Sequence, residues 1–282
     1  MSDIMNKPSN RFYISTGTIV GRANGRDHRV ITDNFEKLDC DGFELMMQAE
    51  WYGKLDAVAA DIKAAGVPTP VIHFDKEIGV TLAEGNKYLA AEAMARFEKN
   101  ASVAEKIGAK KAVFHLWGGP KSDGAVDMEI GLLPEMMRSC REHGVTLMIE
   151  NIPCVFSDPL SVWQRIAESV PDVALIFDTR FGAFHGQYID IFASRLWKNV
   201  IHMHVSSYAG KQNEFGLIRP ILHPGEGTVD FDHLISNMPS YRESVTLESP
   251  VLGDDGTLDL DKLQSSVNYL REKFALYRPD LK

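Results

Sequence analysis

Four short apolar segments in the second half of the chain each end on a side chain that can bind a metal ion. The first runs from Val145 to Ile149, follows Gly144 and ends on Glu150. An apolar run of this length is typical of a strand that is buried on both faces of a parallel sheet. An ionised glutamate is costly at the end of such a strand unless a cation or hydrogen-bond donors meet it. The next three segments end on Asp178, His204 and Glu248, so the pattern predicts one shared site.

Strand-like segments alternate with helical segments from one end of the chain to the other. The expected strands cover residues 12–16, 42–46, 70–74, 111–115, 145–151, 174–178, 200–204 and 244–248. The expected helices cover about 33–40, 54–65, 87–107, 132–143, 158–169, 189–197, 231–238 and 260–274. Eight strand–helix pairs in 282 residues predict an α/β fold, a single (β/α)8 TIM barrel. We expect one domain over residues 1–282, with residues 1–10 as a disordered N-terminal extension.

The alternative fold is a doubly wound open sheet, which usually begins with a glycine-rich phosphate-binding turn after its first strand. The early glycines, Gly17, Gly21 and Gly25, do not have the GxGxxG spacing of that turn. In a TIM barrel the active site lies at the carboxyl ends of the strands, where the four polar residues are expected. The pattern therefore favours the barrel.

Composition and charge exclude several classes of protein. The formal net charge of −9 provides no basic surface for a nucleic-acid backbone, so no nucleic-acid partner is expected. The three cysteines have no CxxC spacing, which is typical of reduced thiols in a cytoplasmic protein. The chain shows no signal peptide and no apolar run of 18 residues, so no membrane association is expected. Whether it forms a homo-oligomer is left open.

The four strand-end residues suit one divalent cation. Three carboxylates and an imidazole favour Mn²⁺, Mg²⁺, Co²⁺ or Zn²⁺. No cysteine belongs to the set, which disfavours a structural zinc site. We therefore expect about one bound cation per chain.

These strand ends resemble a known superfamily. Glu150-Asn151, Phe177-Asp178-Thr179, His202-Met203-His204, Pro224-Gly225-Glu226-Gly227 and Leu247-Glu248 are similar to motifs of the xylose-isomerase-like TIM barrels. That superfamily includes sugar and sugar-phosphate isomerases and epimerases, inosose dehydratase and metal-dependent AP endonucleases. The resemblance implies a metal held by Glu150, Asp178, His204 and Glu248, and a small carbohydrate as substrate.

The chemistry of the set agrees with an isomerase or epimerase of carbohydrate metabolism. A cation that chelates two neighbouring sugar oxygens acidifies the intervening C–H and stabilises the enediolate. Glu150 and Glu248 could then exchange protons with the carbon from opposite faces, one as the base and the other as the acid. Both glutamates are therefore predicted as catalytic residues as well as metal ligands.

Several further residues are candidates for contacts with the substrate. His73 and His115 end the third and fourth strands, where they could contact substrate hydroxyls, order water or bind a second metal ion. His185 and His223 lie in loops over the same end of the barrel, where they could contact substrate or pack the loops. Glu44 ends the second strand and could bind a sugar hydroxyl or pair with an arginine at position 22.

His202 lies two residues before His204, so both side chains face the same side of their strand. We expect His202 one layer deeper than His204, as a hydrogen-bonded core residue.

The chain departs from the resembled pattern at three places. Phe181 stands where the endonucleases have a histidine, and Ile221-Leu222-His223 replaces their Asp-x-His. Ser207 stands where sugar isomerases commonly have an aspartate. The alternatives are thus a related dehydratase or lyase on a sugar or inositol derivative, an endonuclease-like phosphodiesterase, or a sugar-binding barrel without catalysis.

Overall fold

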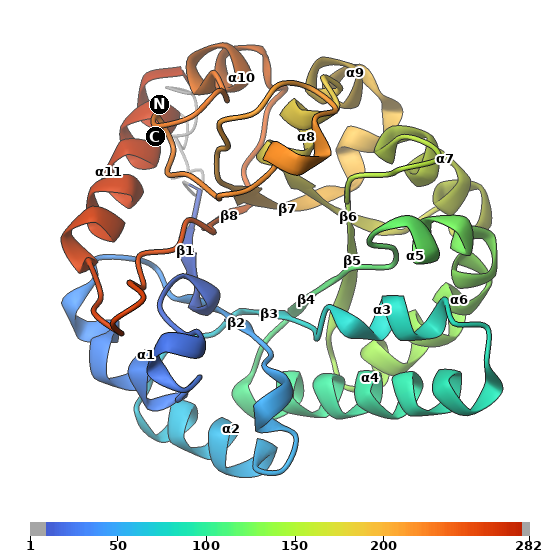
Figure 1. The fold of residues 1–282 in the computed structure, drawn as a ribbon, viewed down its shortest axis with the longest axis horizontal. Helices are drawn as coiled ribbons and strands as arrows, with labels where there is room; N and C mark the ends of the chain where they lie inside the picture. Colours follow the sequence, from blue (N-terminus) through green and yellow to red (C-terminus); the bar gives the residue numbers. More distant parts are fainter. Residues whose placement is uncertain (1–9, 278–282) are drawn as a thin grey trace, which may run out of the picture.

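The computed structural model describes residues 10–277, in which eight parallel strands close into a barrel in chain order (Figure 1). The predicted (β/α)8 barrel is therefore confirmed. The expected N-terminal extension lies outside the described residues, apart from its last residue. The strands are β1 (Phe12–Ser15), β2 (Phe43–Met46), β3 (Val71–His73), β4 (Lys111–Phe114), β5 (Thr146–Glu150), β6 (Ala174–Asp178), β7 (Val200–Val205) and β8 (Ser244–Leu247).

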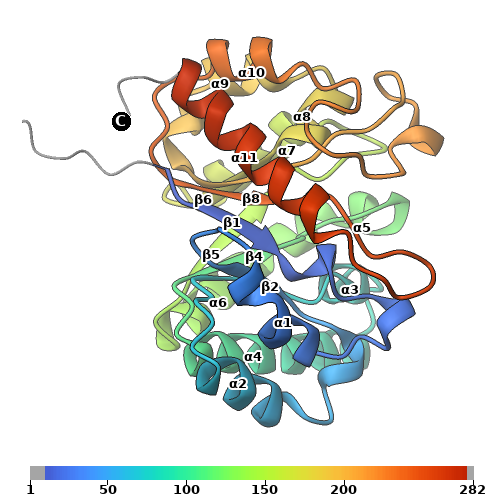
Figure 2. The same ribbon diagram turned by 90° about the vertical axis from the view of Figure 1, so that its left-hand side faces the viewer.

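Helices surround the barrel, and short helices also lie at the carboxyl ends of the strands. Figure 2 shows α3 and α5 on the side toward which the strands point. The helices are α1 (Arg29–Asn34), α2 (Leu55–Ala64), α3 (Glu77–Leu82), α4 (Lys87–Ile107), α5 (Pro120–Gly124), α6 (Val126–Glu142), α7 (Pro159–Ser169), α8 (Thr179–Phe184), α9 (Tyr188–Ala193), α10 (Phe231–Asn237) and α11 (Leu260–Tyr277). None of the helices in the described part of the chain is long and apolar enough to span a membrane.

Local sequence signals fix several of these helices. The carboxylate of Asp158 accepts a hydrogen bond of 2.9 Å from the backbone N–H of Ser161, and Pro159 is the first residue of α7, as predicted. Helix α4 ends at Gly108, whose φ of 81° lies in the left-handed region that glycine adopts without strain. The expected bounds of these two helices are therefore close to the observed ones.

Other predicted bounds were wrong. The helix expected over 132–143 is α6, which begins earlier, at Val126, and has Pro134 in its interior. The helix expected over 33–40 is α1, which ends at Asn34 and is followed by a 3-10 turn. The helix expected over 189–197 is α9, which ends at Ala193 and is also followed by a 3-10 turn. Helices α3, α5 and α8 were not predicted, since runs of five or six residues are too short to show a helical period.

The interior of the barrel is divided into an apolar layer and a polar layer. Val71, Val113, Met148 and Ile176 are completely buried and form a small apolar cluster of their own. Side chains alternate between the two faces of a strand, so the residue two positions later points into the same interior. Those positions are His73, His115, Glu150 and Asp178. The same alternation that builds the apolar layer thus places four of the predicted site residues directly above it.

Candidate metal centre

The four predicted metal ligands meet at the carboxyl ends of the strands. Each of Glu150, Asp178, His204 and Glu248 offers a ligand atom, and these atoms all lie within 4.8 Å of one another. Glu150 and Asp178 are the last residues of β5 and β6, and His204 lies next to the last residue of β7. Glu248 directly follows β8. The structure therefore brings together all four residues that the sequence pattern selected.

His204 uses its two ring nitrogens in different ways. Nδ1 lies 2.7 Å from Oε1 of Glu150 and 3.5 Å from Oε2 of Glu248, so it faces the other ligands. Nε2 lies 2.9 Å from Oε1 of Glu44, on the opposite side of the ring. If the Nε2–H donates to Glu44, the lone pair of Nδ1 is directed at the centre, which is the arrangement found behind many metal-binding histidines.

Glu44 is part of a buried hydrogen-bond network. It is completely buried, and its Oε2 lies 2.9 Å from Nε2 of His202 and accepts a hydrogen bond of 3.0 Å from the Thr246 hydroxyl. Nδ1 of His202 lies 2.6 Å from the hydroxyl of Ser244. His202 is thus the hydrogen-bonded core histidine that its spacing predicts. Glu44 has His202, His204 and Thr246 as its partners, in place of the expected sugar hydroxyl or Arg22.

Apart from Oε2 of Glu150, which lies 2.5 Å from Nε2 of His115, two carboxylate oxygens of the centre have no hydrogen-bond donor among the described residues. One is Oδ2 of Asp178 and the other is Oε1 of Glu248. The second oxygen of Asp178 accepts a hydrogen bond of 2.8 Å from the backbone N–H of Phe181. A buried carboxylate oxygen without a donor is costly, so the pair of unpartnered oxygens fits a site for a cation.

Asn151 holds the end of β6 in place, a role that the sequence analysis did not assign. Its Oδ1 accepts a hydrogen bond of 2.6 Å from the backbone N–H of Asp178, and its Nδ2 donates one of 3.1 Å to the Asp178 carbonyl. Asn151 is completely buried. Its position beside Glu150 in the motif was the only signal for this role.

The surroundings shift the pKa values of the buried ligands in opposite directions. Burial raises the pKa of Asp178 to about 7, and the neighbouring Glu150 and Glu248 add to this effect against Arg180. Burial also acts to raise the pKa of Glu150, but His115 and His204 outweigh it and hold that pKa well below its usual range. Burial acts to lower the pKa of His204, but Glu248, Glu44 and Glu150 raise it well above its usual value. A cation in the centre would replace the proton on His204 and release it.

His73 and His115 form a second cluster with Glu150. Their Nε2 atoms lie 3.2 Å apart, and Nε2 of His115 lies 2.5 Å from Oε2 of Glu150. Nδ1 of His73 lies 2.8 Å from its acceptor, the carbonyl of Phe74, so Nε2 of His73 keeps its lone pair. Burial lowers the pKa of both histidines, which favours neutral imidazoles. The cluster can contact a substrate oxygen, order water or bind a second ion, and all three alternatives stay predictions.

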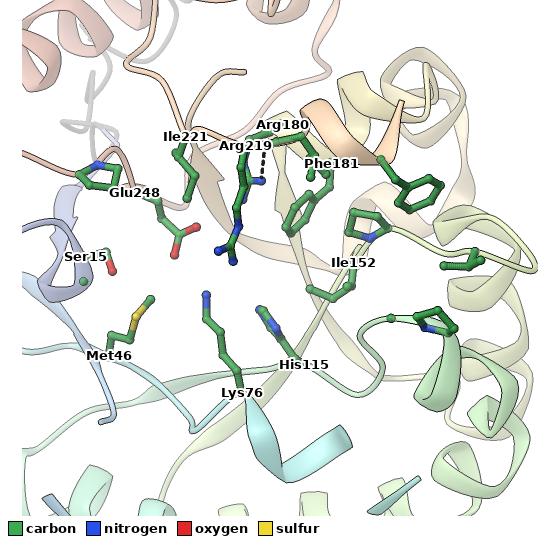
Figure 3. A pocket seen from close by; sticks show the side chains of 18 residues that line it. Ser15, Met46, Lys76, His115, Ile152, Arg180, Phe181, Arg219, Ile221 and Glu248 are labelled. Atoms are coloured by element: carbon green, nitrogen blue, oxygen red, sulfur yellow. Dashed lines mark hydrogen bonds between the residues drawn. The ribbon is translucent and has the colours of Figure 1, made fainter. Parts of the chain in front are cut away.

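A pocket of about 760 Å³ opens above the centre (Figure 3). His115 and Glu248 connect the pocket to the ligand cluster. Apolar side chains form much of the remaining wall. Its lining consists of Ser15, Gly17, Met46, Lys76, His115, Gly119, Pro120, Ile152, Pro153, Val155, Arg180, Phe181, Phe215, Ile218, Arg219, Ile221, Glu248 and Pro250.

His185 and His223 make contacts within the loops and are not among the lining residues of this pocket. Nδ1 of His223 lies 2.7 Å from the Ser266 hydroxyl, and its Nε2 lies 3.2 Å from the carbonyl of Pro250. Nε2 of His185 accepts a hydrogen bond of 3.3 Å from the backbone N–H of Cys154. These contacts match the loop-packing alternative, and a substrate role for either histidine stays a prediction.

A closed parallel barrel of this kind is a TIM barrel, and the carboxylates and imidazoles gathered at its carboxyl end form a candidate metal site. The profile of the xylose isomerase-like TIM barrel family matches residues 33–273, and the chain belongs to this family. No protein with a curated description matches the sequence.

Solved structures share the fold at low sequence identity. A D-tagatose 3-epimerase-like protein is 15% identical with a TM-score of 0.71, over 96% of this chain and 100% of that one. IOLI protein with a bound zinc atom is 14% identical with a TM-score of 0.71, over 96% and 99% of the two chains. The 3-keto-D-glucoside 4-epimerase YcjR from E. coli is 18% identical with a TM-score of 0.66, over 94% and 100%. At these identities the likeness shows a shared fold.

Proposed function

We propose that the protein is a divalent-metal-dependent isomerase or epimerase that acts on a sugar or sugar phosphate. The observation that carries the proposal is the convergence of three carboxylates and one imidazole beneath a pocket, with two carboxylate oxygens left without donors. The names of two similar structures, a D-tagatose 3-epimerase-like protein and a 3-keto-D-glucoside 4-epimerase, are compatible with this class.

The residues fit a hard or borderline divalent cation. Glu150, Asp178, His204 and Glu248 would hold it, and oxygen-rich sets of this kind favour Mn²⁺, Mg²⁺, Co²⁺ or Zn²⁺. Glu44 would orient His204 from behind. When bound, such a cation polarises neighbouring sugar oxygens and makes the C–H between them more acidic.

The two glutamates would move the proton. Glu248 lines the pocket, and its buried Oε1 has no hydrogen-bond donor among the described residues. Glu150 is held in its ionised form by His115 and His204, so it carries no proton before a substrate binds. His115 contacts Glu150 and lines the pocket as well, so it could steady a sugar oxygen beside the reacting carbon. Proton removal at one face and delivery at the other would give epimerisation through an enediolate.

The experiment is to incubate the metal-loaded protein with ketoses and ketose phosphates in D₂O and follow exchange at carbon by NMR. Exchange supports the proposal, and loss of water from the sugar would instead indicate the dehydratase or lyase alternative. Nicking of abasic DNA would indicate the phosphodiesterase alternative. Binding without any of these reactions would indicate a non-catalytic sugar-binding barrel and overturn the proposal.

Variants separate proton transfer from metal binding. Glu150→Gln and Glu248→Gln should abolish exchange even in excess metal, where mass action restores occupancy. His204→Asn should recover in part, because it loses a ligand but no acid or base. The control is Glu129→Gln, since Glu129 is a completely buried glutamate of α6 outside the ligand cluster. Equal recovery of all three site variants would show that the glutamates act as ligands only. A cytoplasmic location and homo-oligomer formation stay sequence-based predictions.

A further inference from the structure

Three cationic side chains line the pocket from three different elements. Lys76 lies just before α3, Arg180 lies in α8, and Arg219 lies in the loop between β7 and β8. Figure 3 shows Lys76 reaching into the pocket beside His115, with the two arginines on the opposite side and Glu248 beside the arginines. Within residues 10–277, no carboxylate oxygen lies within 4 Å of the charged nitrogens of these three residues.

Arg180 is the most informative of the three. It is only 5% exposed, and its Nε donates a hydrogen bond of 3.1 Å to the hydroxyl of Ser206. Its guanidinium lies 4.3 Å from the centroid of the Phe181 ring. Its Nη1 donates a long hydrogen bond of 3.4 Å to the carbonyl of Ile218. These neutral partners fix the position of the guanidinium without a direct ion pair. Against the burial that raises the pKa of Asp178, the guanidinium acts to lower it, and Asp178 belongs to the ligand cluster.

Lys76 and Arg219 are exposed, yet they border the same space. Some exposed arginines of this protein pair with acids: Arg29 contacts Asp27 at 2.6 Å and Arg11 contacts Asp41 at 2.9 Å. Glu248 is the one carboxylate among the pocket-lining residues, and it belongs to the metal-ligand cluster. The wall of the pocket therefore carries an excess of positive charge, although the formal net charge of the protein is −9.

We propose that the pocket binds a carbohydrate with an anionic group, either a phosphate or a carboxylate, which contacts Lys76, Arg180 and Arg219. The carbohydrate part of this inference rests on the proposed function. The sugar carbons would then lie between the three cations and the carboxylates of the centre. Arginine suits this role because its planar guanidinium donates parallel hydrogen bonds to carboxylate and phosphate oxygens.

The test compares sugars that share one carbon skeleton and differ at one end. D-Fructose, D-fructose 6-phosphate and D-fructuronate present a hydroxyl, a phosphate and a carboxylate there, and D-ribulose and D-ribulose 5-phosphate extend the comparison to a shorter chain. Binding to the metal-loaded protein is measured by calorimetry. At least one anionic sugar should bind about tenfold or more tightly than its neutral counterpart, since a charge-assisted hydrogen bond contributes roughly 10- to 150-fold. The stronger of the phosphate and carboxylate arms identifies the anion.

Variants assign the preference to the proposed residues. Lys76→Gln and Arg219→Gln should each weaken binding of the anionic sugar by about tenfold and leave binding of the neutral sugar unchanged. Lys63→Gln and Arg138→Gln, which remove exposed cations outside the pocket, should change neither. Lys76→Arg keeps the charge and should keep the preference. Because Arg180 is buried, Arg180→Gln can change the folding of the protein as well as its binding. The conclusion therefore rests on the Lys76 and Arg219 variants.

The outcomes decide the inference separately from the proposed function. Equal affinity for neutral and anionic sugars, or no binding of the anionic sugars, would overturn it. A preference for anions that both variants retain would also overturn it, because the metal alone would then account for the preference. Deuterium exchange with a neutral sugar and no charge preference would support the proposed function and refute this inference. A preference for the anionic sugar without deuterium exchange would support this inference and refute the proposed function.

Discussion

The contact between Glu44 and His204 predicts that a side chain outside the ligand set controls metal affinity. Both oxygens of Glu44 accept hydrogen bonds: Oε1 lies 2.9 Å from Nε2 of His204, and Oε2 lies 2.9 Å from Nε2 of His202. In Glu44→Gln one of these oxygens becomes an NH₂ group. If the NH₂ group faces His204, it acts as a donor and needs an unprotonated Nε2 as its acceptor. The proton of the neutral imidazole then moves to Nδ1. That proton would then occupy the position from which His204 binds the metal.

The expected loss follows from the bond that is removed. A hydrogen bond to a charged group contributes about 1.5–3 kcal/mol, which corresponds to a factor of roughly 10 to 150 in affinity. Loss of an outer partner of a metal-binding histidine typically costs about 10- to 100-fold in metal affinity or activity. We therefore expect Glu44→Gln to weaken divalent metal binding by about 10- to 100-fold.

The assay is competition between the protein and a chromophoric chelator for Zn²⁺ or Co²⁺, with folding checked by circular dichroism and thermal melting. Glu129→Gln is the matched control. Glu129 is also completely buried, and burial raises its pKa to about 9, so it is neutral near pH 7 and an amide replaces it with little electrostatic change. The argument is refuted if a folded Glu44→Gln protein binds metal as tightly as the wild type, or if the control loses as much affinity.

Three further predictions follow from the structure. Metal analysis should find about one divalent cation per chain and strongly reduced occupancy in Glu150→Gln; unchanged content would contradict the ligand assignment. Gly227→Ala should destabilise the protein by about 1–3 kcal/mol in urea unfolding, since a Cβ there would lie 2.4 Å from the Tyr208 carbonyl oxygen, whereas Gly131→Ala has open space and should not. The pKa of His143 is raised by hydrogen bonds, first with Glu98, so its contribution of about 0.5–1 kcal/mol is complete below the unfolded pKa of about 6.5 and is lost as the pH rises through the folded pKa. Replacing it by Gln should therefore reduce stability at about pH 5.5 and not at about pH 9; equal losses would refute this.

The sequence pattern could predict the barrel and the convergence of the candidate ligands because both depend on regularities within single strands. An apolar run that ends on Glu150 or Asp178 indicates a buried strand and shows which polar residue lies at its carboxyl end. In a barrel those ends must meet, so one pattern predicts the convergence of residues that are far apart in the chain. The bounds of α6 and α1 were less predictable, because Pro134 and a 3-10 turn interrupt the local signals.

The partners of Glu44 could not be predicted in the same way. Its hydrogen bonds to His202 and His204 connect β2 with β7 across the interior, at sequence separations of 158 and 160 residues. Such a contact depends on how strands face each other across the closed barrel, which no local period encodes. The same holds for Lys76, Arg180 and Arg219, which approach one pocket from irregular segments and a short helix.

The buried carboxylates around His204 differ in how far the protein itself satisfies them. Glu44 accepts from two imidazoles and a hydroxyl, and these partners hold its pKa well below the usual range against its burial. Asp178 is just as buried, yet its Oδ2 has no donor among residues 10–277, and burial raises its pKa to about 7. An unmade hydrogen bond in the interior costs about 1–3 kcal/mol. Glu129, outside the ligand cluster, also has two carboxylate oxygens without donors, and burial keeps it neutral by raising its pKa to about 9. Within the group around His204, the unpartnered oxygens belong to residues of the ligand cluster, whereas Glu44 contacts the opposite ring nitrogen of His204 from Glu150. This asymmetry is what we expect where a cation supplies the missing partner on one side only.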